Sequence, residues 1–396
     1  MNLLNINISL ILLLFNASYG QVYKTSKIIV DKQTKKPLEF VNINNDFDNT
    51  ISNVDGSFLF LSKKNVINIS SLGYKSIATT FDFINTIDTL FLEHNPIELN
   101  EIVVTNTTSL LNDVYRNISY NYPMKPYNEI FFLRCLLKKN GEICRLQDVF
   151  GSIERNTLFV NQTIKEDEYK AEISNMRKVE IADKNKIEYV EFPSFKNLFR
   201  WYAAIFTIPS DYNFTKVQSN DQEYFKIEYT KNDKNTNNVT RNGYYIINKK
   251  DKSIKEVSFK LTGETNKIPY IAKNPLKWKT IESELLVNFI KNPTENKYYI
   301  GNAKLRTVTE IINESNDQKD IFEATYELIT IESFTDNKIK PNFSVDRDLF
   351  KAKFPYSEDF WNNQNQLPLT NELKTFLRRI AENKSNKSVY KIIGNF

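Results

Sequence analysis

The feature of this sequence that most constrains its fold is a two-residue alternation of apolar and polar side chains, which recurs over much of its second half. Alternation at this period places every second side chain on one face of a β-strand. The clearest runs cover 223–230, 243–263, 298–311 and 320–334. The alternate positions carry many Lys and Glu residues. We therefore expect a large antiparallel sheet with one face in water and an apolar face that something must cover.

Three segments depart from this alternation. Apolar residues recur at helical spacing in 110–118, inside a predicted helical connector at 105–125. Near the C-terminus, 371–382 predicts a helix with one apolar stripe that could cover the open sheet; the stripe consists of Leu373, Phe376, Leu377 and Ile380. The short apolar run at 198–209 contains an arginine and indicates a buried helix or strand, with membrane contact as the alternative.

The N-terminal segment has the features of an export signal. An unbroken apolar run covers 10–15, and the small residues Ser18 and Gly20 fit cleavage before Gln21. The run is too short to span a bilayer as a helix, and no later window reaches the roughly 20 apolar residues that a spanning helix needs. We expect a signal peptide at 1–20 and an exported protein that is periplasmic or associated with the outer membrane.

The stretch 38–58 concentrates Asp, Asn and Gly between two apolar runs. Counted from Asp46, its first odd positions carry oxygen ligands, as in a calcium loop. Such a loop also needs Gly at position 6 and Glu at position 12, and these positions hold Ile51 and Ser57. Turn chemistry explains the composition better, because Asp and Asn bond their own backbone and tolerate the left-handed region.

Short apolar stretches surround this turn-rich segment, at 28–30, 40–43, 58–60, 67–69 and 90–92. Turn signals separate them at roughly 8–12 residues, which predicts a small β-sandwich.

The same region resembles a known family. The resemblance is carried by four pieces in order: Val30-Asp31 with Pro37-Leu38, Asp55-Gly56-Ser57-Phe58, Ser71-Leu72-Gly73-Tyr74, and Leu99-Asn100-Glu101-Ile102-Val103-Val104. Together they look like the carboxypeptidase regulatory-like domain, a transthyretin-like β-sandwich, over residues 22–104. The resemblance implies a noncatalytic accessory module, of the kind also found at the N-terminus of TonB-dependent outer-membrane receptors.

The rest of the chain carries weaker resemblances. The hairpin at 246–259 resembles strands of the half-barrel carriers that move lipoproteins or bind apolar ligands outside the inner membrane. The segments 133–141 and 360–377 look like uncharacterised exported proteins. The expected fold is therefore mainly β: a transthyretin- or Ig-like sandwich at 21–104, then the connector, then a large antiparallel, half-barrel-like sheet with a few helices at 126–396.

Two cysteines, Cys135 and Cys144, flank a predicted hairpin turn at Asn140 and Gly141. A two-residue turn there pairs Cys135 with Leu146 and leaves the two cysteines on one face but diagonal to each other. Diagonal neighbours lie about 7–8 Å apart by Cα, whereas a disulfide prefers Cβ atoms about 3.8 Å apart. A bulge could repair the spacing, so a disulfide and two half-buried thiols both remain open.

The sequence offers little material for catalysis or metal binding. His94 is the single histidine, no common nucleophile or phosphate-loop motif is present, and two cysteines with one distant histidine cannot complete a zinc site. Acidic groups at 166–168 and 282–284 could in principle supply paired carboxylates for glycoside cleavage. We expect no enzyme activity, no metal and no cofactor.

The net charge of +5 is spread along the chain without a basic block, which argues against a nucleic-acid partner. We expect a noncatalytic binding or assembly protein of the bacterial cell envelope, with an apolar ligand, a lipid or an envelope protein as its partner and with peripheral membrane association. The expected ligand contacts are Phe225, Ile227, Val257 and Phe259. The alternatives are a carboxylate-dependent envelope hydrolase and a small outer-membrane β-barrel.

Overall fold

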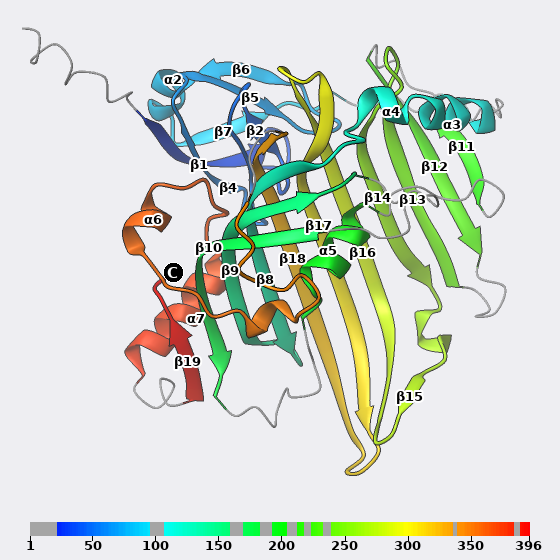
Figure 1. Cartoon of the computed structure of the whole chain (residues 1–396), viewed down its shortest axis with the longest axis vertical. Helices are drawn as coiled ribbons and strands as arrows, with labels where there is room; N and C mark the ends of the chain where they lie inside the picture. Colours follow the sequence, from blue (N-terminus) through cyan, green and yellow to red (C-terminus); the bar gives the residue numbers. More distant parts are fainter. Residues whose placement is uncertain are drawn as a thin grey trace, which may run out of the picture.

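The structure is a computed structural model that describes residues 22–95, 107–158, 169–182, 192–203, 212–217, 223–232, 239–335, 339–383 and 389–396. It contains a small β-sandwich, a large antiparallel sheet and a C-terminal segment, 357–383, whose two helices lie on one face of that sheet (Figure 1). The expected fold class is confirmed: the chain is mainly β, with a large antiparallel sheet and few helices.

The sandwich is built from two small sheets. One has the order β4-β1-β7, with β1 (Tyr23–Asp31), β4 (Ser57–Ser62) and β7 (Thr89–Leu92). The other has the order β3-β2-β5-β6, with β2 (Asn42–Asn44), β3 (Asn49–Ile51), β5 (Val66–Ser70) and β6 (Ile77–Thr80), followed by helix α2 (Phe81–Asn85). The fully buried side chains between them come from the apolar stretches that predicted the sandwich; they include Ile29, Ile43, Phe58, Phe60, Ile67 and Ile69.

The turn before β4 depends on a glycine. Gly56 has φ +72°, and a Cβ atom there would lie 2.3 Å from the carbonyl oxygen of Ile29. The position therefore requires a residue without a side chain, which explains the turn pair of Asp55 and Gly56 in the sequence.

Among the described residues, the large sheet has twelve strands in the order β11-β12-β13-β14-β16-β17-β18-β8-β9-β10-β19, with β15 beside β16. Their bounds are β8 (Tyr127–Lys139), β9 (Glu142–Arg155), β10 (Tyr169–Ile181), β11 (Asn213–Val217), β12 (Tyr224–Asn232), β13 (Val239–Asn248), β14 (Ile254–Gly263), β15 (Ile271–Lys273), β16 (Leu276–Asn292), β17 (Lys297–Asn313), β18 (Gln318–Phe334) and β19 (Tyr390–Ile393). Because β18 returns to pair with β8, the longest strands lie in the middle of the sheet.

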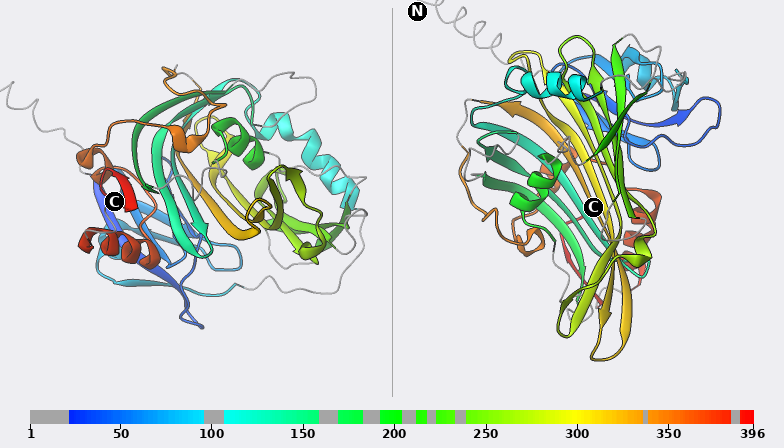
Figure 2. Two further views of the ribbon diagram at one scale, coloured as in Figure 1. Left: turned by 90° about the horizontal axis from the view of Figure 1, so that it is seen from below. Right: turned by 90° about the vertical axis from the view of Figure 1, so that its right-hand side faces the viewer.

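The sheet is strongly curved, and its concave face holds the main core (Figure 2). Helix α5 (Phe195–Ala203) lies in the hollow, where the ring of Phe131 contacts the rings of Phe195 and Phe199 at centroid distances of 5.5 and 5.7 Å. Helices α3 (Thr107–Arg116) and α4 (Ile118–Asn121) and the 3-10 turn η4 (Leu349–Lys351) add to this core; a second such turn, η3 (Thr265–Lys267), precedes β15. The apolar run that begins at 198 is thus helical over 198–203, and the rest of it lies outside the described residues.

The convex face carries the sandwich and the C-terminal segment. Helix α6 (Glu358–Asn362) places Trp361 against Phe132 and Phe150, with ring centroids 6.1 and 6.4 Å apart. Helix α7 (Asn371–Glu382) matches the predicted bounds, and the hydroxyl of Thr370 accepts a hydrogen bond from the backbone N–H of Leu373. Leu373 packs with Ile143 and Leu146 of the sheet. The helix was expected to cover the apolar face of the sheet, but it packs on the convex face, opposite the main core, so the face expected in water is also partly covered.

A row of alternating charges crosses the convex face. Cross-strand partners in β17, β18, β8, β9 and β10 place these side chains directly opposite one another: Lys304, Glu327, Arg134, Asp148 and Arg177. We call this row the charge ladder. Opposite charges on directly opposed strand positions stabilise the sheet, and here the signs alternate over five strands.

The ladder also holds the two layers above it. At one end Lys304 pairs with Glu39 of the sandwich. Near the other end, the guanidinium of Arg134 donates to the carbonyl oxygen of Pro368 at 2.9 Å, and Arg177 donates to the side-chain oxygen of Gln366 at 2.7 Å. The sandwich and the C-terminal segment are therefore fixed to one line of charges on the sheet.

Candidate functional site

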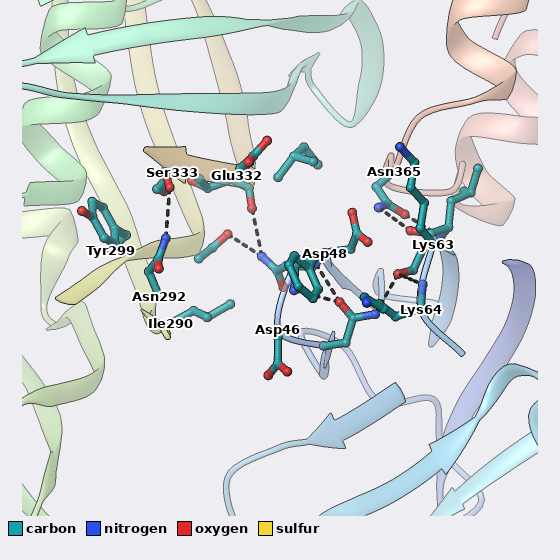
Figure 3. Close-up of a pocket in the computed structure, with 18 of the residues that line it drawn as sticks. Asp46, Asp48, Lys63, Lys64, Ile290, Asn292, Tyr299, Glu332, Ser333 and Asn365 are labelled. Carbon is teal, nitrogen blue, oxygen red and sulfur yellow. Dashed lines mark hydrogen bonds between the residues drawn. The ribbon is translucent and has the colours of Figure 1, made fainter. Parts of the chain in front are cut away.

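A cleft of about 740 Å³ opens where the sandwich meets the upper ends of β16, β17 and β18 (Figure 3). Three groups of residues line it: the β2–β3 and β4–β5 turns of the sandwich, the hairpin between β16 and β17 with the end of β18, and residues 363–365 of the C-terminal segment. The volume lies in the range of ligand pockets in proteins.

The turn between β2 and β3 forms the sandwich side of the cleft, and an asparagine fixes its shape. The side-chain oxygen of Asn45 accepts hydrogen bonds from the backbone N–H groups of Phe47 and Asp48, at 3.0 and 2.8 Å. Its side-chain nitrogen donates to the hydroxyl of Ser62 at 2.8 Å. Phe47 is left 62% exposed at the rim. The residues that the sequence assigned to turn chemistry do form a turn, and that turn is one wall of the cleft.

The opposite wall is a fork in the large sheet. β17 and β18 pair only as far as Asn302 opposite Ile329. Beyond that pair, β17 remains paired with β16 as far as Lys297, and β18 remains paired with β8 as far as Phe334. Within the described residues, no strand lies between the facing edges of 297–301 and 330–334, and the two strand ends diverge in Figure 1.

Side-chain amides occupy the fork in place of a strand. The side-chain nitrogen of Asn49 donates to the carbonyl oxygens of Gly301 and Thr330, at 3.0 and 3.1 Å. Further out, the side chain of Asn292 donates to the carbonyl oxygen of Ser333 at 3.1 Å. The side-chain oxygen of Asn49 is buried and has no hydrogen-bond partner. A buried, unpartnered amide oxygen costs about 1–3 kcal/mol unless something binds it.

Charges of both signs surround the cleft in equal number, with three acidic and three basic side chains: Asp46, Asp48, Glu332, Lys63, Lys64 and Lys291. Burial raises the pKa of the Asp48 carboxyl, although a hydrogen bond with Ser62 and the charge of Lys63 oppose the shift. The cleft therefore has no strong net charge, and it suits a ligand that is polar without being highly charged.

The contact behind the cleft is a row of amides. Asn302 of β17 donates to the side-chain oxygen of Asn42 in the sandwich at 2.6 Å and accepts from Asn288 at 3.0 Å. Asn365 exchanges two hydrogen bonds with the backbone of Leu61, at 2.7 and 2.9 Å. The walls of the cleft are thus held by mostly buried amides that are hydrogen-bonded to one another or to the backbone, although the side-chain oxygens of Asn49 and Asn288 have no partner.

The four predicted ligand contacts do not line this cleft. Phe225, Ile227 and Val257 are buried in the core of the concave face, and Phe259 is partly exposed. They share the face that the alternation predicted, but three of them already pack against the protein itself. Their role as ligand contacts stays a prediction.

The structure leaves both cysteines as buried free thiols. The predicted pairing of Cys135 with Leu146 is wrong, because a bulge after Leu137 places Cys135 opposite Gln147. The thiol of Cys144 lies 3.2 Å from the carbonyl oxygen of Leu137, and burial raises its pKa to about 11. Cys144 is therefore an unreactive thiol that is hydrogen-bonded to the backbone.

The other candidate groups have structural partners. His94 lies 2.5 Å from the carboxylate of Asp31, and its ring contacts that of Tyr74. Glu282 pairs with Arg306 and Glu284 with Lys260, each at 2.6 Å, and 166–168 lie outside the described residues. In the described part of the chain, no group of three or more His, Cys, Asp or Glu side chains could hold a metal, and no helix is long and apolar enough to cross a membrane.

A second buried charged pair lies on the concave face. Arg155 donates to the carboxylate of Glu129 at 2.5 and 2.9 Å, and its guanidinium lies over the ring of Phe199. Burial raises the pKa of Glu129, while the charge of Arg155 opposes the shift. The pair is sealed under α5, away from the cleft.

Comparison with known proteins does not place the chain in a family. No protein-family model matches the chain, and no curated protein matches it. Among solved structures, one similar chain is a domain described as an outer-membrane lipoprotein-sorting protein from Vibrio parahaemolyticus. It is 12% identical, the match covers 59% of this chain and 95% of that one, and the TM-score is 0.28. A likeness at this level does not assign a function to the chain.

Proposed function

We propose that this protein is an exported, noncatalytic binding protein of the bacterial cell envelope, and that the cleft between the sandwich and the fork is its ligand site. The observation that carries the proposal is that the sandwich and the large sheet together build the cleft, around a sheet opening in which side-chain amides replace a strand. Polar groups arranged in this way are suited to recognise a ligand rather than to transform one.

The fixed contact between the layers supports a preformed site. The buried amides of Asn42, Asn288 and Asn302 and the pair of Lys304 with Glu39 hold the sandwich in one position on the sheet. A ligand that enters such a cleft does not have to order its walls, so more of the contact energy remains as affinity.

The envelope location rests on the N-terminal apolar run and on the resemblance of 22–104 to the carboxypeptidase regulatory-like domain. In this proposal the sandwich is an accessory module that contributes the wall formed by Asn45 to Asn49. Binding of an apolar ligand or lipid at Phe225, Ile227, Val257 and Phe259 is the weaker alternative, since three of these side chains are already buried.

The test is native purification of the protein from the cell envelope, followed by mass spectrometry of the small molecules, lipids and proteins that accompany it. Two variants make the result specific. Ser333→Phe adds a ring to the cleft wall, whereas Gln318→Phe adds one at an exposed position at the far end of the same strand.

We expect a ligand that accompanies the wild type and Gln318→Phe and is at least tenfold depleted with Ser333→Phe. A ligand that is equally abundant in all three preparations, or no enriched ligand at all, would overturn the proposal. Thermal unfolding of each variant confirms that it is folded before the comparison is made.

A further inference from the structure

We propose that the ligand of the cleft is an extended polypeptide segment, which adds as a β-strand to the free edges of β17 and β18 in the fork. The inference rests on the proposed function and names the class of its ligand. Strand addition to an exposed sheet edge is a common mode of peptide recognition, with main-chain hydrogen bonds supplying affinity and alternate side chains supplying specificity.

The fork is long enough for such a site. Each free edge is five residues long, at 297–301 and 330–334. Five residues of strand extend about 16 Å at roughly 3.3 Å per residue. Each edge is already paired on its outer side, with β16 or with β8, although a bulge interrupts each pairing, at Gly301 and at Ile331. The edges are therefore held in position before a partner arrives.

The asparagine side chains in the fork occupy the place of the missing strand. A side-chain amide has the same N–H donor and carbonyl acceptor as a peptide group. Asn49 and Asn292 donate to three backbone carbonyls of the two edges, those of Gly301, Thr330 and Ser333. An inserted strand replaces these side-chain contacts, because its own N–H groups donate to the same carbonyl oxygens. The unpartnered oxygen of Asn49 is then available to accept from an N–H of that strand.

The other polar groups favour a peptide over a sugar. A sugar site needs side-chain amides that are free to bind hydroxyl groups, but three of the asparagines that line the cleft are engaged with the protein's own backbone. Asn45 bonds its own turn, Asn365 bonds Leu61, and the side-chain oxygen of Asn292 accepts from the backbone of Thr294 and Glu295. The exposed ring of Phe47 at the rim offers an apolar surface for one face of an alternating peptide.

The rim charges limit the sequence of the peptide. Three acidic and three basic side chains line the cleft, so a segment with a block of like charges meets repulsion from the charges of the same sign. We infer an uncharged or mixed-charge segment without proline, because proline lacks the N–H that the edge requires.

The experiment uses the full chain and a phage-displayed library of random octapeptides. Enriched peptides are synthesised with blocked termini, and hydrogen exchange of the protein is measured with and without them. We expect exchange to slow at least tenfold within 297–301 and 330–334, with no change in 303–313, which is paired on both sides.

The peptide itself supplies the matched control. N-methylation of alternate residues keeps every side chain and removes the N–H donors of one edge. We expect at least a tenfold loss of affinity in at least one of the two methylation registers, and loss of binding with Ser333→Phe but not with Gln318→Phe. No enriched peptide, protection outside the fork, or full tolerance of methylation in both registers contradicts the inference.

The two proposals fail in different ways. If purification yields a sugar or lipid that is depleted with Ser333→Phe while no peptide binds the fork, the cleft is a ligand site and the peptide inference is wrong. If no ligand of any class depends on Ser333, both proposals are wrong.

Discussion

The two faces of the large sheet are made by the same alternating strands, yet they are covered by different physical means. On the concave face, aromatic and aliphatic side chains fill the hollow around α5, and the buried pair of Glu129 with Arg155 lies among them. On the convex face, small apolar clusters around Trp361 and Leu373 also pack against the sheet, but the charge ladder and a row of amides add polar contacts that hold the sandwich and the C-terminal segment. Apolar packing accepts many arrangements of similar volume, whereas paired charges and amides fit only in one register.

The polar contacts of the convex face fix the positions of the sandwich and the C-terminal segment on the sheet. Asp148 accepts two hydrogen bonds from Arg134, at 2.8 and 2.9 Å, and two from Arg177, at 3.0 and 2.8 Å. Arg177 also lies over the rings of Trp361 and Phe396, 4.4 and 4.7 Å from their centroids. One carboxylate thus orients two guanidinium groups, and these groups position the C-terminal segment.

The substitution Asp148→Ala should have the largest effect on the stability of the protein. It leaves two buried guanidinium groups without their carboxylate, and removal of one partner from a buried ionic group costs about 3–5 kcal/mol. We expect that loss in the free energy of unfolding, measured by urea denaturation. As a control, the triple variant Arg134→Met, Asp148→Leu, Arg177→Met should recover much of the stability, because no buried charge is left unpaired. A loss below about 1 kcal/mol for the single variant would contradict the assigned role.

On the concave face, Glu129→Gln should cost less than Asp148→Ala. Burial already raises the pKa of Glu129, so its charged form is less favoured than that of Asp148. The amide retains one acceptor for Arg155, and a hydrogen bond to a charged group is worth about 1.5–3 kcal/mol. We expect a loss in this range by the same denaturation. A loss equal to that of Asp148→Ala would mean that the two faces depend on their charges equally.

Lowering the pH should change the stabilisation contributed by Asp148 on the convex face and by Glu129 on the concave face in opposite directions. Burial opposes ionisation of Asp148, but Arg134 and Arg177 outweigh it and hold its pKa below the usual range. Its stabilisation is therefore fully present above the unfolded value of about 3.9 and is lost as pH falls through the folded pKa. The raised pKa of Glu129 acts oppositely: its contribution falls as pH rises from about 4.3 through the folded value.

Unfolding measured between pH 3 and 7 on the wild type, Asp148→Asn and Glu129→Gln tests these signs. The stability gap between wild type and Asp148→Asn should widen as pH rises. The gap between wild type and Glu129→Gln should narrow over the same range. Each unit of pKa shift corresponds to about 1.4 kcal/mol. Parallel curves for the three proteins would disprove the assignment.

The smallest expected effect is that of Leu133→Met. Leu133 is fully buried on the concave face, and Met has a similar volume and a flexible side chain. Volume-conserving apolar changes usually cost less than about 1.5 kcal/mol. Thermal unfolding checks this value, and a larger loss would show that the concave core also depends on exact shape.

Much of the fold could be predicted from the alternation alone. The strands that contain Phe225, Val257 and Tyr326 place them on the buried face, as a period of two requires. The helix at 371–382 has its cap at Thr370 and its stripe toward the sheet. The bulge that moved Cys135 opposite Gln147 could not be predicted, because one extra residue in a strand leaves the local pattern almost unchanged.

The sequence does not predict the cleft or the fork. The residues Asp46 to Asn49 were assigned to turn chemistry, and asparagine is common throughout the chain, so nothing marked Asn49 as different from its neighbours. One signal is present in the sequence: Phe47 is an aromatic residue inside a polar turn, and aromatic residues are not among those that turns favour.

The sequence by itself determined the strands, the turns and which side chains would be buried, since these follow from spacing along one chain. Tertiary structure alone decided that five charges from separate strands meet in one row, that β17 and β18 part, and that Asn49 lies between them. Those relations join residues up to 281 positions apart. No local period records such a pairing, because it is set by how the strands are ordered and how the sheet curves around its core.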